Sequence, residues 1–235
     1  MLKYGIFYFF FQFIIIANCI SQEVNFEFEN TIDRSQTSTF CIQNSGQHYL
    51  LTSYNNLIDQ SGLYKSRIFD IDVNGMLVNE ANFEVENSDL KIFSLLEQND
   101  FYIGIGQVNN LETDSNFLWF AKIDLDLNLL EEKLIYLNNL KLNSPQCKII
   151  DNVVFGVGSG LSDFGLSDYA FKISLDGDLL VLSSDIQAMP FQSINSFIKS
   201  DNNSLLLFGF KLVETDLDFN VIDIVEERPL SLIHI

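Results

Sequence analysis

Oxygen-bearing side chains recur at alternate positions in four short segments of the chain. These segments are Asp72-Val-Asn74, Asp124-Leu-Asp126-Leu-Asn128, Asp176-Gly-Asp178 and Asp216-Leu-Asp218-Phe-Asn220. Alternating carboxylate and amide oxygens in a loop can bind Ca²⁺, a hard cation that takes about six to eight oxygen ligands. The same residues also stabilise tight turns through side-chain hydrogen bonds to the local backbone, and we favour this second interpretation.

The two longest segments contain the calcium candidates. These residues are Asp124, Asp126 and Asn128 in one segment, and Asp216, Asp218 and Asn220 in the other. Both segments depart from the helix-loop-helix calcium loop, because Leu129 and Val221 stand where that loop needs glycine and the flanking segments are predicted strands. We therefore predict no cofactor, with Ca²⁺ as the alternative that these six residues leave open.

Residues suited to catalysis form no recognisable set. Outside the last six residues the only histidine is His48, which begins a predicted strand and which we interpret as a surface or strand-edge residue. Spacing alone selects no carboxylate pair for glycoside hydrolysis. The Gly-x-Gly pairs at 104–106 and 156–158 lie inside predicted strands with no helix after them, so they do not match a phosphate-binding fingerprint. We predict no catalytic and no cofactor-binding residue.

Four large aromatic residues fall on predicted third strands of the repeat described next. They are Tyr64, Trp119, Phe120 and Tyr169. Aromatic side chains in such positions can line a sugar-binding rim, but they more often pack between neighbouring sheets. We favour the packing interpretation.

A repeat of about 52 residues organises the chain. Thr52, Gly104, Gly156 and Gly209 lie 52, 52 and 53 positions apart, each in an apolar segment, and the acidic segments follow with a similar spacing. Several short strands per unit at this period are typical of β-propeller blades, whose crowded inner strands favour glycine. The predicted fold is all-β: a β-propeller with three complete four-stranded antiparallel blades plus a partial fourth, in an incomplete ring.

The predicted boundaries follow this repeat. Blade 1 covers 39–87, blade 2 covers 88–139, blade 3 covers 140–188 and the partial blade 4 covers 189–229, all within a propeller fragment at 22–229. Blade 4 is expected to be partial because nine residues separate Gly209 from Asp218, against twenty from Gly156 to Asp176. Its third strand should be shortened or fused to the second. Residues 230–235 match the translation of a sequencing-adapter end, so we exclude them from fold reasoning.

The segment at 22–38 is predicted to hold a closing strand and a linker. Its residues 25–30, NFEFEN, resemble residues 82–87, NFEVEN, in the outer strand of blade 1. Propellers commonly close when one terminus adds a strand to the blade built by the other terminus. We therefore expect Glu23–Glu29 to be an outer-edge strand, with a frayed terminus as the alternative.

Residues 1–21 are typical of a secretory signal peptide. One lysine precedes an apolar run, and small or polar residues follow it. The run is too short and too interrupted for a membrane span, so we predict no membrane insertion after signal removal and a secreted or cell-surface location. Cys41 and Cys147 hold matching positions in blades two apart, and we predict that no disulfide joins them.

The charge balance limits the partners. Acidic residues outnumber basic ones by 32 to 13, for a formal net charge of −19. Such a charge repels nucleic acid and anionic membrane surfaces, so we predict no nucleic-acid partner and interpret the acidic surface as a solvated exported one.

The repeat unit resembles that of secreted Bacteroidetes propeller proteins, many of which carry a sorting domain for type IX secretion. The residues that carry the resemblance are the LLTSY and YIGIG strands, the FLWFAKID and YAFKIS strands, and the Asp-rich turn followed by Leu-Leu. The resemblance covers about residues 39–225 and implies an exported or surface-attached protein. The expected function is a non-enzymatic scaffold that binds proteins or glycans at a blade-end face; alternatively, the chain is a fragment of a propeller-fold glycosidase or lyase.

Overall fold

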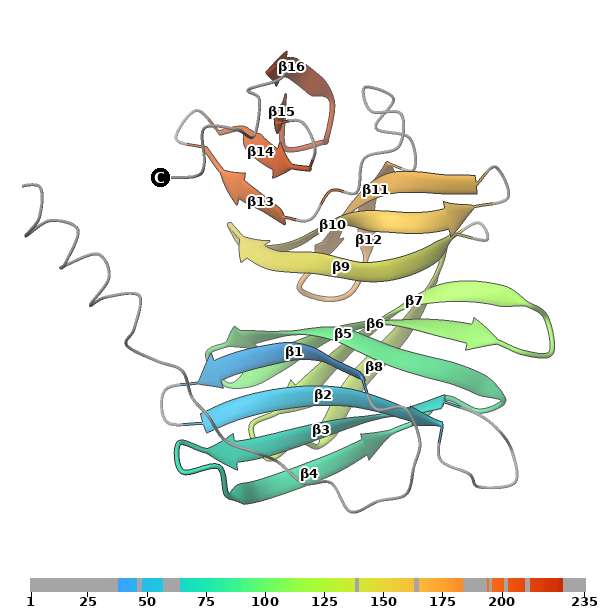
Figure 1. Cartoon of the computed structure of the whole chain (residues 1–235), viewed down its shortest axis with the longest axis vertical. Helices are drawn as coiled ribbons and strands as arrows, with labels where there is room; N and C mark the ends of the chain where they lie inside the picture. The colour runs from blue at the N-terminus through green and yellow to red at the C-terminus, as the bar shows by residue number, and fades with distance from the viewer. Residues whose placement is uncertain are drawn as a thin grey trace, which may run out of the picture. The chain divides into compact units, whose positions relative to one another are not determined.

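In the computed structural model, the chain is described over residues 38–45, 48–56, 64–137, 140–162, 165–183, 194, 196–200, 203–209 and 212–225. Within these ranges every regular element is a β-strand (Figure 1). The first eight strands are β1 Ser38–Ser45, β2 His48–Asn56, β3 Tyr64–Asp72, β4 Leu77–Phe83, β5 Ser88–Gln98, β6 Phe101–Asn110, β7 Ser115–Asp124 and β8 Leu129–Tyr136. The last eight are β9 Lys141–Ile150, β10 Val153–Ser162, β11 Gly165–Ser174, β12 Leu179–Ser183, β13 Ser196–Lys199, β14 Leu205–Phe208, β15 Leu212–Thr215 and β16 Val221–Val225.

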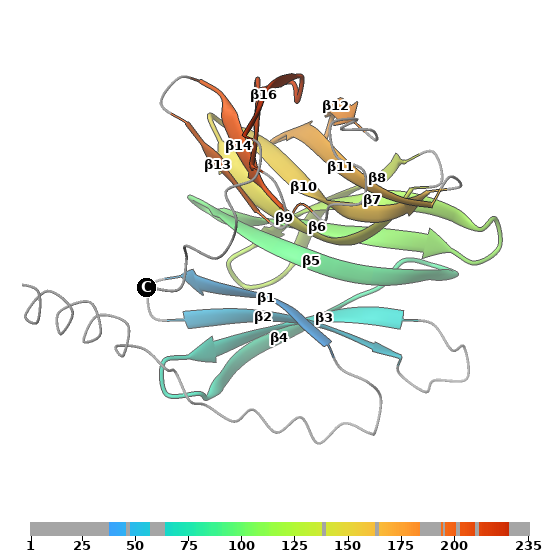
Figure 2. The ribbon, with the colours of Figure 1, turned by 45° about the horizontal axis from the view of Figure 1, so that its top comes forward.

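The strands form four antiparallel sheets of four strands each. Sheet 1 is β1–β4, sheet 2 is β5–β8, sheet 3 is β9–β12 and sheet 4 is β13–β16, and in every sheet each strand pairs with the next strand of the chain. Figure 2 shows this up-and-down order in sheet 1. The 52-residue repeat therefore predicted the sheets and their antiparallel pairing correctly.

The fourth sheet corrects one part of the prediction. It was expected to be partial, yet it contains all four strands. Its third strand is indeed short, because β15 has only the four residues Leu212–Thr215. The turn that follows, at Asp216–Asn220, nevertheless has the same backbone hydrogen bonds as the turns of the longer sheets.

Apolar side chains fill the space between consecutive sheets in three clusters. The cluster between sheets 1 and 2 includes Leu50, Ile68, Phe83, Trp119, Ala121 and Ile123. The cluster between sheets 2 and 3 includes Ile103, Ile105, Phe120, Tyr169, Phe171 and Ile173. The cluster between sheets 3 and 4 includes Phe155, Val157, Ala170, Phe197, Leu207 and Val213. Because side chains alternate along a strand, the third strands of sheets 2 and 3 each supply residues to the sheet before and to the sheet after their own.

The repeated glycines leave room for aromatic rings that lie across neighbouring strands. Gly156 pairs with Phe171, and a Cβ atom at Gly156 would lie 2.0 Å from Phe171 Cζ. At the corresponding Gly104, a Cβ atom would lie 2.8 Å from Trp119 Cζ3. The expected role of the glycines as packing devices is confirmed, with the covering ring as the physical reason.

Some predictions fall outside the described residues. These are the signal peptide at 1–21, the closing strand within 22–38 and the tail at 230–235. The two cysteines do hold matching register positions, since Cys41 pairs with Thr52 in sheet 1 and Cys147 pairs with Gly156 in sheet 3. Cys147 is a buried thiol whose sulfur lies 4.0 Å from the carbonyl oxygen of Pro145.

Candidate functional site

The acidic segments form the hairpin turns between the third and fourth strands of the sheets. In each turn the N–H of the first residue donates to the carbonyl of the fifth at 2.9 Å, in the pairs Asp72/Met76, Asp124/Asn128, Ser174/Asp178 and Asp216/Asn220. The fourth residue has a positive φ, with values of 82° for Gly75, 66° for Leu127, 80° for Gly177 and 65° for Phe219. All four turns therefore share one backbone conformation, a tight turn that ends in a β-bulge.

The first side chain of each turn accepts hydrogen bonds from the turn's own backbone. Asp216 Oδ1 accepts from the N–H of Asp218 at 2.8 Å and from the N–H of Asn220 at 2.9 Å. Asp124 Oδ1 accepts from the N–H of Asn128 at 2.7 Å, and the Asn128 amide donates to Asp124 Oδ2 at 2.9 Å. The Asn128 side chain and then its N–H hold the pKa of Asp124 below its ordinary value. These carboxylates act as turn stabilisers.

In two turns, the carboxylate of the third residue accepts a hydrogen bond from a lysine of the preceding sheet. Lys122 of sheet 2 donates to Asp176 in the turn of sheet 3 at 2.9 Å. Lys172 of sheet 3 donates to Asp218 in the turn of sheet 4 at 2.7 Å. The hydrogen bond to Asp176 is the main reason that the pKa of Lys122 is raised. We name these two contacts the lysine clamps.

The interface between sheets 1 and 2 uses a different contact. The residue that corresponds to Lys122 is Asp70, whose Oδ1 lies 2.9 Å from Nδ1 of His48. The turn of sheet 2 is reached instead by Asn79 of sheet 1, whose amide donates to the carbonyl of Asp126 at 2.8 Å. His48, interpreted from the sequence as a strand-edge residue, is the first residue of β2 and is partly exposed.

The six calcium candidates therefore lie in two separate turns. Asp124, Asp126 and Asn128 belong to sheet 2, whereas Asp216, Asp218 and Asn220 belong to sheet 4. In each turn the amide of the fifth residue and the carboxylate of the first bind one another. Across the described ranges, no group of three or more histidine, cysteine or acidic side chains is placed to hold a metal ion. The hydrogen bonds support the turn interpretation of these residues.

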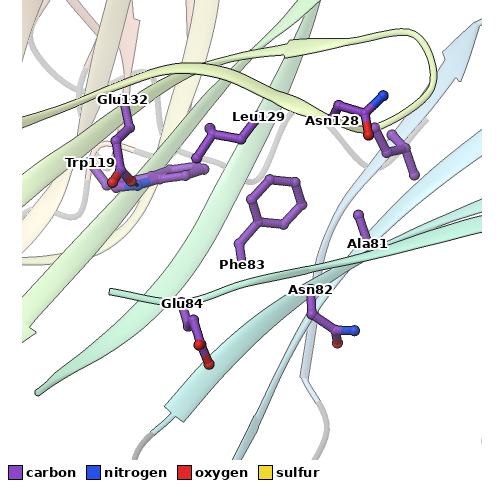
Figure 3. A pocket seen from close by; sticks show the side chains of 9 residues that line it. Ala81, Asn82, Phe83, Glu84, Trp119, Asn128, Leu129 and Glu132 are labelled. Atoms are coloured by element: carbon purple, nitrogen blue, oxygen red, sulfur yellow. Dashed lines mark hydrogen bonds between the residues drawn. The ribbon is translucent and has the colours of Figure 1, made fainter. Parts of the chain in front are cut away.

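A groove of about 490 Å³ opens between the end of β4 and the start of β8 (Figure 3). Phe83 points into it, while the neighbouring Asn82 and Glu84 point to the opposite side of β4. Its other lining residues are Ala81, Trp119, Leu127, Asn128, Leu129 and Glu132. The sequence did not predict this groove, because its two sides come from different sheets and only the stacking of the sheets brings them together.

Three side chains that line the groove, Trp119, Glu132 and Glu84, have polar partners in the structure. Trp119 Nε1 donates to Glu132 Oε2 at 3.0 Å, and the Phe83 ring meets the Trp119 ring edge-on with centroids 6.0 Å apart. Glu84 forms an ion pair with Lys65 at 2.6 Å. The groove thus has an apolar floor, made by Phe83 and Leu129, and a side wall in which Trp119 is fixed by Glu132.

The large aromatic side chains pack between the sheets, as we favoured. Trp119, Phe120 and Tyr169 are fully buried. Trp119 contributes to the cluster with sheet 1, whereas Phe120 and Tyr169 meet in the cluster between sheets 2 and 3. The side chain of Tyr64 lies outside the described part of the structure.

No protein-family model matches this chain, and no curated protein matches it. Among the described residues, no helix is both long enough and apolar enough to cross a membrane.

Proposed function

We propose that the four sheets are blades of a β-propeller and that the protein is an exported, non-enzymatic scaffold that binds a protein partner. The observation that carries this proposal is the repeated unit: four sheets with the same strand order, the same hairpin turn and successive apolar clusters. Stacked, similar blades are the construction principle of propellers. Export is supported by the signal-like residues 1–21.

A protein partner fits the described surface better than a glycan does. Sugar binding usually needs an aromatic ring with an open face, but Trp119, Phe120 and Tyr169 are fully buried. The start of every outer strand instead exposes an apolar pair: Leu77 and Val78, Leu129 and Leu130, Leu179 and Leu180, and Val221 and Ile222. Exposed apolar residues on edge strands favour the addition of an extended protein segment.

The groove is the best candidate for the contact. Leu129 belongs both to an exposed pair and to the groove lining, so an apolar side chain of a bound segment can rest on Leu129 and Phe83. The groove is lined by two carboxylates, Glu84 and Glu132, and their contacts do not favour the glycosidase or lyase alternative. Glu132 accepts a hydrogen bond from Trp119, and Glu84 pairs with Lys65 on the other side of β4.

The test uses Trp119, which is the only tryptophan of the chain. Peptides selected from a displayed library against the protein, and a set of soluble hexasaccharides, are titrated while Trp119 emission is recorded. We expect peptides to shift the emission and the variant Leu129→Ser to lose this shift, whereas Leu180→Ser on sheet 3 keeps it. A shift caused by a hexasaccharide, together with release of reducing ends, would refute the proposal in favour of the enzyme alternative.

A further inference from the structure

The outer strand of sheet 2, β8, has an open edge. In the described part of the chain, β8 pairs only with β7. The N–H of Leu137, which follows β8, donates to the carbonyl of Asn116 at 3.3 Å, so the backbone of Leu137 points toward β7. Backbone groups alternate in direction along an antiparallel strand, and those of Glu132 and Leu134 therefore point outward. The N–H and C=O groups of these two residues can bond to an added strand.

The side chains of Glu132 and Leu134 lie on the face of β8 that is turned toward sheet 1. Their register partners are Ala121 and Trp119, which belong to the cluster between sheets 1 and 2. Leu134 is 44% exposed, and Tyr136 on the same face is 50% exposed. In the other outer strands, the exposed apolar side chains among the described residues are only the first two of each strand. An apolar face that continues along the strand is therefore a property of β8.

Glu132 adds a negative charge to this apolar face. Its Oε2 accepts from Trp119 Nε1 at 3.0 Å, and a carboxylate has a second oxygen that can bind a cation. The only basic residue of β8 is Lys133, which lies on the opposite face and donates to Asp178 of sheet 3 at 3.1 Å. The face turned toward sheet 1 thus complements a basic side chain that has apolar neighbours.

A second copy of this chain is a poor source of that basic side chain. Two antiparallel β8 strands related by a two-fold axis place residues an even number of positions apart opposite one another. Glu132 would then face Glu132, Leu134 or Tyr136, and never Lys133. The remaining outer strands, β4, β12 and β16, contain no lysine and no arginine. The net charge of −19 also opposes self-association, so these features favour a segment of a different protein.

We propose that β8 binds an extended segment of a cationic partner protein, added antiparallel to its open edge and with the sequence apolar-x-apolar-x-basic. Read from its N-terminus, the segment places its apolar residues opposite Tyr136 and Leu134 and its basic residue opposite Glu132. Antiparallel pairing is the more stable kind, and directly opposite residues lie on one face of the sheet. Glu132 also lines the groove, so the basic residue lies beside it (Figure 3).

This inference rests on the proposed binding of a protein partner and adds the direction, register and sequence class of the bound segment. Strand addition of this kind obtains its affinity from main-chain hydrogen bonds and its specificity from alternate side chains. The two contributions are therefore tested separately.

The first test concerns the charge. The probe is the fluorescein-labelled peptide Thr-Val-Thr-Val-Thr-Lys-Thr, whose binding to the full chain is read by fluorescence anisotropy. Glu132→Gln keeps an acceptor for Trp119 but removes the charge, and should weaken binding by about two- to fivefold. Glu131→Gln is the matched control on the opposite face and should change binding by less than about 1.5-fold. A peptide with norleucine in place of lysine should bind the wild type and Glu132→Gln equally.

The second test concerns the main chain and leaves the protein unaltered. In the proposed register, the N–H groups of the second valine and of the lysine point to β8, whereas those of the threonines point away. N-methylation of the second valine or of the lysine should weaken binding by about tenfold or more, because it removes a hydrogen bond and adds a clash. N-methylation of the threonine between them should change binding by less than about twofold.

The outcomes separate this inference from the proposed function. Selected peptides that need Leu129 for their emission shift, but that bind equally well without a basic residue and with either methylated backbone, would overturn this inference and leave the protein-partner proposal standing. Binding of no peptide, designed or selected, would overturn both. Dimers of the protein that dissociate when the peptide binds would assign the edge to a second copy and overturn this inference.

Discussion

Adding one methyl group at Gly156 tests how the aromatic rings and glycines fit together. In Gly156→Ala the new Cβ would lie 2.0 Å from Cζ of Phe171, whereas ordinary contact begins at 3.4 Å, so the ring must move by about 1.4 Å. Phe171 is fully buried in the cluster between sheets 2 and 3 and stacks on Tyr169 with ring centroids 6.3 Å apart. The ring therefore has little space into which it can move.

The expected loss of stability follows from two opposing effects. Overpacking of a buried site costs about 1–3 kcal/mol, and this displacement belongs at the upper end of that range. Replacing glycine by alanine in a strand returns about 0.5–1 kcal/mol of backbone entropy. The net cost is about 2 kcal/mol, which lowers the melting temperature of a chain of this size by about 4–8 °C.

Urea denaturation of four proteins measures the effect: wild type, Gly156→Ala, Phe171→Leu and the double variant. Leucine has no atom at the Cζ position, so the double variant should be more stable than the sum of the single losses predicts, by about 1–2 kcal/mol. Gly104→Ala serves as a graded control, because its Cβ would lie 2.8 Å from Trp119 and should cost less. If Gly156→Ala unfolds at the wild-type urea concentration, the ring does not fill the space above the glycine and the reasoning is refuted.

Three further predictions concern the turns and the clamps. A double-mutant cycle of Lys172→Met and Asp218→Asn should give a coupling of about 0.5–1 kcal/mol that shrinks at high salt, since Asp218 is largely exposed; a zero coupling would contradict the clamp. Leu127→Gly should destabilise the protein by about 2 kcal/mol in urea, because the loss of a buried side chain exceeds the relief of its positive φ; a more stable variant would contradict this. Because the pKa of Asp124 is lower in the folded protein than its ordinary value of 3.8, the ionised carboxylate stabilises the fold above pH 3.8, and this stabilisation is lost as the pH falls through the lower folded pKa. Asp124→Asn should therefore make the urea midpoint decrease less between about pH 5 and pH 2. A variant with the wild-type pH profile would contradict this.

The sequence was sufficient for the sheets because each strand and each turn is determined locally. The period from Thr52 to Gly156 locates the second strands, and Gly75 and Gly177 mark two of the turns through their positive φ. The other two turns use Leu127 and Phe219 at the same backbone position. These two residues accept the positive φ because each is buried, Leu127 in the cluster with sheet 1 and Phe219 edge-on to Phe155. Such compensation depends on contacts between sheets, which a local pattern does not contain.

The same limit explains the fourth sheet. The nine-residue gap after Gly209 left too little chain for strands as long as those of sheet 3, so a partial unit was expected. The length that a strand needs depends on what covers it. Val213, in the middle of β15, is fully buried against sheet 3, and Phe219 closes the same cluster from the turn. A four-residue strand is enough because the neighbouring sheet supplies the apolar contacts.

The structure also shows where the few basic residues of this acidic chain lie, which the sequence alone did not. Six lysines donate to, or pair with, groups of a neighbouring sheet: Lys122, Lys133, Lys141, Lys148, Lys172 and Lys199. They are nearly half of the 13 basic residues of the chain. The scarce cations are therefore concentrated where sheets meet, and the acids that they bind include three members of the repeated turns, Asp176, Asp178 and Asp218. Some turn carboxylates accept hydrogen bonds from the backbone of their own turn, and others accept one from a lysine of the preceding sheet. We interpret both kinds of contact as part of the stacking of the repeat. The lysine contacts join residues about 50 positions apart in the chain. The spacing of acidic residues within a single turn contains no information on such contacts, so the sequence left Ca²⁺ binding as an alternative.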